Sequence, residues 1–286
     1  MESIVFPDET FPVYLRTESI AARSLHSEMA HWHEHIEILV VSRGSVCCRA
    51  AGVSFPLHTG DVCVINRRQM HQVLSGDGED CCHKVLIVGT GLLRQNMALY
   101  EKYIRPMLED PRFTHIRFDG GDGRAAAIAE LVAQAERLDR ERERGYELEL
   151  LAAIHRLFRQ LYLAYSDAPR ALPPDGNAML QQQMAAYIYE NYGGELGLSD
   201  IAAAGSVSRS QCAKLFKQYT GLSPVAFLTR HRLERSLDRL RTTGESIAAV
   251  AQSCGFADQS YFTRLFLREY GCTPTAYRRG GLPAAG

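Results

Sequence analysis

The sequence lacks a secretion signal and a membrane-spanning segment. Its first residues, MESIVFPDET, are acidic and contain no basic stretch followed by an apolar one. No apolar run approaches the roughly 20 residues that a membrane helix needs. The eight cysteines include no C-x-x-C pair, and they are too sparse for a disulfide-stapled domain, which favours reduced thiols. We therefore expect a cytoplasmic protein that makes no contact with a membrane.

The charge of the chain is unevenly distributed. The 286 residues are 46% hydrophobic and 23% charged, which is typical of a globular protein of two domains. Residues 1–165 contain 19 Lys and Arg against 23 Asp and Glu, whereas residues 195–286 contain 12 against 7. A basic C-terminal module favours a polyanionic partner, although an ordinary solvated surface can show the same excess.

Three regions with different sequence patterns follow one another along the chain. Short β-rich runs, such as IEILVV and KVLIV, are separated by turn signals between about residues 36 and 88, which predicts an antiparallel sandwich or barrel. From residue 91 to residue 165 the apolar spacing becomes helical and predicts two helices. SDAPRALPPDGN, with three prolines, reads as a linker. We therefore predict domains at 1–165 and 178–286, joined by a linker at 166–177.

The second of these helices, residues 146–165, is apolar on two faces. One face packs on the neighbouring helix, and a second stripe remains, formed by Leu148, Leu151, His155 and Tyr162. A self-complementary stripe of this kind suits two-fold pairing of antiparallel helices, so we predict a homodimer that forms here. The alternative is that the barrel covers this stripe.

The C-terminal region contains the same motif twice. A short apolar helix, a turn with Gly205, a possible N-cap at Ser208 and an amphipathic helix form one helix-turn-helix, and about fifty residues later the layout returns with a CGF turn. Each copy ends in Gly followed three residues later by Pro, at Gly221 and Gly271, which suits a left-handed helix cap before the next helix. A helix from about residue 224 to residue 241 would join them over roughly 27 Å, near the roughly 34 Å between successive major-groove faces.

Residues 195–281 resemble the AraC/XylS family of bacterial transcription regulators. The residues that carry the resemblance are Ala251, Gly255-Phe256, Ser260-Tyr261-Phe262, Phe266, Gly271, Thr273-Pro274 and Tyr277-Arg278. The N-terminal part also looks like the family's sensor domain. The resemblance implies a cupin-like antiparallel β-barrel followed by two helices, and an all-α domain with tandem helix-turn-helix units. It further implies a regulator that binds double-stranded DNA and a small-molecule effector and works with RNA polymerase. We expect this regulator to activate transcription, although the sequence alone does not distinguish an activator from a repressor.

Pattern and resemblance together select the residues that would contact DNA. The candidates for base edges are the outward residues of the two second helices, namely Ser210, Gln211, Ala213, Lys214, Gln259, Ser260, Tyr261, Thr263 and Arg264. The candidates for phosphate contacts are Ser208, Arg209, Lys217, Arg230, Arg268 and Arg278. For each cation a solvated surface charge is the competing interpretation. The phenylalanines of these helices follow the buried period and are predicted to be core.

The stretch HWHEHIE places three histidines and two carboxylates in seven residues. On an extended strand His31, His33, His35 and Glu37 would share one face. The spacing of His31, His33, Glu37 and Gly44 fits the first cupin motif, but Cys63 stands where the second motif has its metal-binding histidine. We therefore expect His31, His33, Glu37 and His71 to line an effector pocket that contains no metal and no cofactor. The open alternative is zinc held by His31, His33, Glu37 and Cys63.

Three functions of different classes remain on the sequence alone. A ligand-responsive transcription regulator is the expected one, and it is not an enzyme. A metal-dependent cupin enzyme with a DNA-binding tail is disfavoured by Cys63 and by the lack of another paired acid and base motif. A metal or thiol sensor is suggested by five cysteines in the predicted barrel, namely Cys47, Cys48, Cys63, Cys81 and Cys82. Against it, cysteine commonly packs as a small buried hydrophobe.

Overall fold

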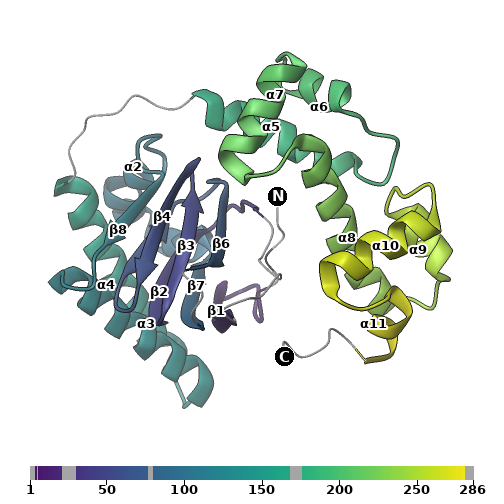
Figure 1. Ribbon diagram of the computed structural model, residues 1–286. Coiled ribbons are helices and arrows are strands. Elements are labelled where there is room, and N and C mark those ends of the chain that lie inside the picture. Colours follow the sequence, from purple (N-terminus) through teal and green to yellow (C-terminus); the bar gives the residue numbers. More distant parts are fainter. Residues whose placement is uncertain (1–3, 5, 21–29, 77–79, 168–175, 281–286) are drawn as a thin grey trace. The chain divides into compact units, whose positions relative to one another are not determined.

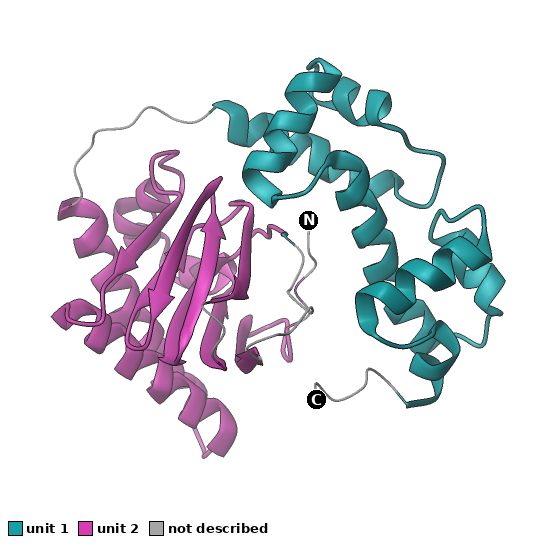
Figure 2. Ribbon diagram, in the orientation of Figure 1, with its two compact units in different colours: residues 1, 24–30, 176–286 teal, residues 2–23, 31–175 magenta. Residues whose placement is uncertain are grey.

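The computed structural model describes residues 4, 6–20, 30–76, 80–167 and 176–280. The chain forms two compact units, whose main parts are residues 31–175 and 176–286 (Figure 2). Most of the predicted linker, residues 168–175, lies outside the described residues, but its first two residues end one helix and its last two begin the next. Among the described residues no helix is both long and apolar enough to cross a lipid bilayer.

The unit formed mainly by residues 31–175, magenta in Figure 2, contains two antiparallel sheets, as the sequence predicted. The five-stranded sheet has the order β1 (Val13–Ile20), β7 (Cys81–Val88), β2 (Ile36–Arg43), β5 (Val62–Ile65) and β8 (His115–Phe118). The three-stranded sheet has the order β4 (Val53–His58), β3 (Ser45–Ala50) and β6 (His71–Ser75). We call this unit the sensor domain.

Strand β2 shows how the two faces of the larger sheet are used. Leu39 and Val41 pack with the three-stranded sheet in the interior of the barrel, whereas Ile38 and Val40 pack with α3 (Gly123–Glu141) and α4 (Tyr146–Asp167). In Figure 1 these two helices lie together along the sheet. Because side chains alternate along a strand, Glu37 shares the interior face with Leu39. The pattern thus sends a carboxylate into the barrel.

Two features of the sensor domain differ from the sequence prediction. Strand β2 begins only at Ile36, so residues 31–35 are not an extended strand. Between β7 and α3 the chain forms short helical pieces, η1 (Thr90–Gln95), α1 (Met97–Leu99), η2 (Tyr100–Ile104) and α2 (Arg105–Leu108), and then strand β8. Strand β8 has only four residues, His115–Phe118, and its pairing partner β5 lies about fifty residues earlier, so no local pattern revealed it.

The other unit, teal in Figure 2, which we call the DNA-binding domain, contains seven described helices. They are α5 (Gly176–Asn191), α6 (Leu198–Ala204), α7 (Arg209–Thr220), α8 (Pro224–Thr242), α9 (Ile247–Ser253), α10 (Gln259–Tyr270) and α11 (Pro274–Gly280). Ser208 caps α7 by accepting from the Gln211 amide at 3.2 Å, as predicted. Gly221 and Gly271 end α7 and α10 with φ of 74° and 70°, which confirms the predicted left-handed caps.

The two turns of the repeat have the same geometry with different residues. Ser206 has φ of 53° in the first turn and Gly255 has φ of 83° in the second. Glycine is required at the second position, because a Cβ there would collide with the Tyr192 carbonyl oxygen and the Arg232 guanidinium. Phe256, Phe262 and Phe266 are buried, and they pack with α8 residues such as Leu233. The phenylalanines of the second helix-turn-helix are therefore core residues, as predicted.

Candidate functional sites: a nucleic-acid interface and a buried polar cluster

The predicted base-reading residues all lie outside the helical core. Exposed side chains are Ser210, Lys214, Gln259, Ser260, Tyr261 and Arg264. Half-buried ones are Gln211, Ala213 and Thr263. They occupy the first turns of α7 and α10, the second helix of each helix-turn-helix, while Cys212 and Phe262 point inward. Two helices with solvent-facing polar residues at their N-terminal ends are what a major-groove reader presents.

The predicted phosphate contacts divide into two groups. Arg209 and Arg268 are exposed on α7 and α10. Arg230 instead pairs with Glu269 at 3.2 Å, and Arg278 donates to the Leu240 carbonyl at 3.2 Å. These two arginines tie α8 to α10 and α11, because their heads are half-buried against neighbouring helices.

The remaining two candidates serve helix ends. Lys217 donates to the Gly221 carbonyl at 2.9 Å, and Ser208 caps α7. The structure thus gives four of the six predicted phosphate residues a contact within the domain. Such a contact is compatible with phosphate binding only where the charged end of the side chain stays exposed, as in Lys217. Sequence spacing could not separate the groups, because the partners of Arg230 and Arg278 lie 38 or more residues away.

Arg232 is a further residue that the sequence did not single out. Its Nε donates to the Tyr192 carbonyl at 2.8 Å and its Nη2 to the Gly194 carbonyl at 2.7 Å. Burial lowers the pKa of Arg232. This arginine fixes the joining helix α8 against the end of α5 and against the second turn at Gly255. It therefore helps to set how the two reading helices are spaced.

Four ionisable side chains meet inside the sensor domain. His31, His33, Glu37 and His71 are all buried, and one potential ligand atom from each lies within 4.8 Å of the others. Glu37 Oε2 lies 3.0 Å from His33 Nε2 and 3.3 Å from His71 Nε2. The structure thus brings the predicted effector-pocket residues together. His35 does not join them, because its ring packs edge-on against Phe6 instead.

The expected gap in the ligand set is not there. Cys63 lies with Leu39 and Ile65 in the apolar core between the sheets, whereas His71, at the start of β6, fills the fourth place beside His31, His33 and Glu37. The prediction that the set is broken at its fourth position, and the alternative with Cys63 as a ligand, are both corrected by this geometry. The sequence prediction measured the spacing of the second motif from Gly60, which led to Cys63. In the structure the turn that precedes the histidine lies at Arg68, three residues before His71, and Arg68 has φ of 62°.

Burial and mutual contact control the charges in this cluster. Burial lowers the pKa of His71, and the neighbouring His31 lowers it further. Burial alone would raise the pKa of Glu37, but His71 and His33 outweigh it and hold that pKa well below its usual range. The cluster therefore contains a carboxylate held in its ionised form beside the His71 imidazole, whose protonation is disfavoured by burial.

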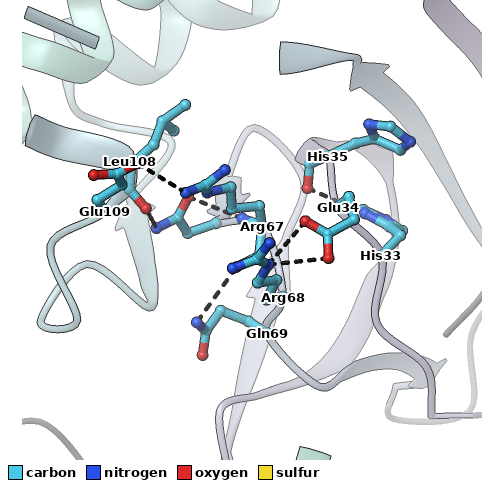
Figure 3. Close-up of polar contacts among 9 residues, drawn as sticks. His33, Glu34, His35, Arg67, Arg68, Gln69, Leu108 and Glu109 are labelled. Atoms are coloured by element: carbon cyan, nitrogen blue, oxygen red, sulfur yellow. Dashed lines mark hydrogen bonds and ion pairs between the residues drawn. The ribbon is translucent and has the colours of Figure 1, made fainter. Parts of the chain in front are cut away.

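The turn before β6 connects this cluster to the helical part of the domain. Arg68 Nε donates to both Glu34 oxygens at 3.0 and 2.8 Å, and Arg67 lies 3.5 Å from Glu109 beside α2 (Figure 3). The buried Asn66 amide donates to the Leu108 and Phe113 carbonyls at 3.0 and 2.8 Å. Sequence reasoning missed these residues, since their partners lie 34 to 47 residues away in the sequence.

The predicted dimer stripe is only partly open. Leu148 is 75% exposed, and His155 is also exposed. Leu151 is half-buried against the core, and the Tyr162 ring meets the Tyr103 ring edge-on at 5.2 Å. The segment around Tyr103 was not expected to reach this face. Beside it lies a cavity of about 400 Å³, lined largely by apolar side chains that include Tyr100, Phe158 and Tyr162.

The cysteines are free thiols. All eight lack a disulfide, and Cys48, Cys63 and Cys81 are buried. A hydrogen bond with Cys63, together with burial, raises the pKa of Cys48 well above its usual range. Because the thiolate is the reactive form, this raised pKa makes Cys48 unreactive. The buried thiols Cys48 and Cys81, whose pKa values are both raised, do not support the thiol-sensor alternative.

Comparison with known families agrees with both halves of this description. Residues 17–171 match the family model of the AraC-like ligand binding domain, and residues 201–280 match a helix-turn-helix domain. The chain belongs to the AraC family. Like other AraC-family transcription regulators, it combines an N-terminal ligand-binding domain with a helix-turn-helix DNA-binding domain.

Individual relatives place this AraC-family regulator among known transcription factors. It is 26% identical to the transcriptional activator RhaS of Klebsiella pneumoniae, over 97% of this chain and 98% of that protein. It is 24% identical to the uncharacterised regulator YdeC of Bacillus subtilis, over 87% and 85%. The crystal structure of fatty-acid-bound ToxT from Vibrio cholerae matches 96% of this chain and 97% of that one, with a TM-score of 0.53 and 13% identity. That likeness confirms the two-domain fold.

Proposed function

We propose that this regulator reads a bipartite DNA site with α7 and α10, under the control of a small effector bound at the His31, His33, Glu37 and His71 cluster. The observation that carries the proposal is the placement of two exposed reading helices before and after α8. With 19 residues, α8 is about 28 Å long, near the 34 Å between successive major-groove faces on one side of DNA. The RhaS relatives are named activators, so we infer activation, through RNA polymerase, in the cytoplasm. The relatives are regulators, so we do not expect an enzyme.

The exposed side chains suggest how the bases are distinguished. Arg264 can form a bidentate pair with guanine, and Gln211 and Gln259 can pair with adenine. Arg209 and Arg268 lie on the same helices and suit phosphate, because long cations beside the readers fix position rather than sequence. We assign Arg230 and Arg278 to the internal structure of the domain and not to DNA.

The effector would act through the turn at residues 66–71. Asn66 fixes this turn to the segment after α2, and in that segment Asp110 accepts a hydrogen bond from Tyr165 of α4 at 2.7 Å. Helix α4 ends at Asp167, close in sequence to the DNA-binding domain. A ligand that changes the position of His71 therefore acts on a connected set of contacts that reaches α4. A ligand can shift the molecule only by binding two arrangements differently, and this set is where we infer the difference.

The open part of α4 supports a homodimer. Leu148 and His155 remain exposed, and His155 lines the apolar cavity at Tyr162, so two copies of this face could cover each other about a two-fold axis. Two copies would present four reading helices and bind paired sites more tightly than one copy.

Selection of binding sites from random DNA tests this proposal. The wild-type protein should return one motif, and Arg264→Ala should lose about 1–3 kcal/mol on it with relaxed preference at one base pair. Arg268→Ala should weaken all sequences alike and reduce the salt dependence by about one counter-ion. Arg241→Ala, on the exposed face of α8, is the matched control and should bind as wild type. An unchanged motif and affinity for Arg264→Ala would remove α10 from the interface.

A further inference from the structure

We propose that His31, His33, Glu37 and His71 bind one divalent transition-metal ion inside the sensor domain. One part of the inference rests on the proposed function, namely its regulatory consequence that the effector contacts the bound ion. Metal binding itself is measured without DNA. It departs from our sequence-based expectation of a metal-free pocket, whose basis was the supposed loss of the fourth ligand.

The distances suit a single ion. Four-coordinate ligands with bonds of about 2.1 Å lie about 3.4 Å apart. Here Glu37 Oε2 is 3.0 Å from His33 Nε2 and 3.3 Å from His71 Nε2. The whole set of ligand atoms falls within 4.8 Å. Small side-chain movements would bring all four donors to bonding distance without a change of fold.

The imidazoles are already oriented as ligands. His33 Nδ1 lies 3.1 Å from the His35 carbonyl oxygen, and His71 Nδ1 lies 2.8 Å from the Gln69 carbonyl oxygen. A carbonyl only accepts, so each Nδ1 carries a proton and donates it, which leaves each Nε2 as the ring atom directed at Glu37. Metal-binding histidines are generally held in this way, by a second hydrogen bond from the other ring nitrogen.

The same arrangement leaves a charge problem that a cation solves. Two imidazole Nε2 atoms and a carboxylate oxygen face one another in a buried site where all three residues are at most 3% exposed. Buried charge is costly unless it is paired or coordinates a metal. A divalent ion between Glu37, His33 and His71 would neutralise the buried carboxylate and take all three atoms as ligands.

The scaffold around the cluster is also built to hold it. Glu37 comes from the five-stranded sheet and His71 from the three-stranded one. His31 is tied to His71 by two backbone hydrogen bonds of 3.0 and 2.8 Å, and the Arg68 amide donates to the His33 carbonyl at 2.7 Å. The ligands are therefore fixed by backbone contacts on both sheets, and a bound ion would join the sheets.

The donor set indicates which ions fit. Three imidazoles and one carboxylate suit Zn²⁺, Mn²⁺, Fe²⁺ or Ni²⁺, whereas Mg²⁺ and Ca²⁺ prefer oxygen ligands alone. An ion that takes five or six ligands would keep positions open. An effector with a carboxylate or hydroxyl oxygen could occupy one of these positions, and this is the ligand class we assign to the site.

The test uses the full chain without an affinity tag, so that no added histidines bind metal. Protein is stripped with a chelator, dialysed against Zn²⁺, freed of excess ion and measured by mass spectrometry of the metal. We expect about one Zn²⁺ per chain, and less than about a tenth of that for His33→Ala and for His71→Ala. The controls are His58→Ala, which removes an exposed histidine, and Cys63→Ala, which removes the previously considered ligand. Both should keep the full equivalent.

A second measurement needs no variant and so does not depend on whether the variants fold. X-ray absorption of the Zn²⁺-loaded wild type should show nitrogen and oxygen neighbours only. A sulfur neighbour, less than about a tenth of an equivalent in the wild type, or equal loss in the His58→Ala control would each overturn the proposal.

The regulatory consequence is measured separately, as DNA affinity with and without Zn²⁺. Sequence-specific DNA binding by a protein that takes up no Zn²⁺ would refute the metal site alone. A stoichiometric metal site on a protein that binds no specific DNA would refute the proposed function alone.

Discussion

The two domains place their ionisable groups in opposite ways. The sensor domain buries His31, His33, Glu37 and His71 between its sheets. The DNA-binding domain instead has phenylalanines in the core of its second helix-turn-helix and keeps Arg209 and Arg264 in solvent. A small ligand is held best where water is excluded, since each polar contact is stronger in a low dielectric. A polyanion needs exposed cations that can displace its counter-ions. The difference shows that charge position, more than net charge, separates the two functions.

The largest effect should come from the core of the second helix-turn-helix. Phe266 is fully buried and packs edge-on against Tyr270 at 4.7 Å. Phe266→Ala should lower the stability of the DNA-binding domain by about 3–5 kcal/mol and abolish specific DNA binding. Thermal unfolding should show a shift only in the transition of that domain.

Leu39→Ala in the barrel core is the mirror-image control for this experiment. It should shift only the transition of the sensor domain, by about 2–5 kcal/mol. If either variant moved both transitions equally, the two domains would share one cooperative core, and the comparison between them would fail.

Acid should weaken the DNA-binding domain through one buried histidine. Burial, together with Arg235, lowers the pKa of His231 to about 3, while its unfolded value is about 6.5. The unfolded chain therefore takes up a proton first as the pH falls, and stability is lost progressively between pH 6.5 and about pH 3. From pH 7 to pH 5 this group should cost about 2 kcal/mol.

His231→Phe isolates this contribution. The His231 ring packs edge-on against Tyr189 and Tyr192 at 4.7 and 5.0 Å, and phenylalanine can keep those contacts. Urea unfolding of the DNA-binding transition at pH 7 and pH 5 should show a smaller acid loss in the variant than in the wild type. Equal losses in the two proteins would assign the acid sensitivity to other groups.

A smaller effect is expected at the proposed dimer face. Leu148→Glu places a charge on the 75% exposed position of α4 and should raise the dimer dissociation constant at least about tenfold, or about 1.4 kcal/mol. Sedimentation should show the monomer at concentrations where the wild type is dimeric. Leu267→Glu, at a 47% exposed leucine of α10, is the control and should leave the dimer intact. A Leu148→Glu protein that is still dimeric would move the interface elsewhere.

Local signals in the sequence were enough for the DNA-binding domain. The caps at Ser208, Gly221 and Gly271 and the buried period of Phe262 and Phe266 act within a few residues, so the repeat could be predicted. What could not be predicted there is the pairing of Arg230, Arg232 and Arg278, whose partners are 38 to 40 residues away.

The sensor domain shows where sequence reasoning stops. His31, His33 and Glu37 form a local motif, but the choice between His71 and Cys63 depends on pairing of β3 with β6 and on the bridge between His31 and His71. These contacts join distant segments and leave no periodic trace. A left-handed turn at Arg68 takes the place where a glycine would have been the visible signal.

The central claim is that one chain reads two DNA elements with helices attached to a single joining helix. The direct test is the affinity of the full chain for its selected site when base pairs are inserted between the two elements. The selected site should contain two elements with centres about 10 base pairs apart. Inserting about five base pairs between them should cause a large loss of affinity, and changes in either element should have a specific effect. A selected site with only one element, or an affinity that does not depend on the spacing, would contradict it.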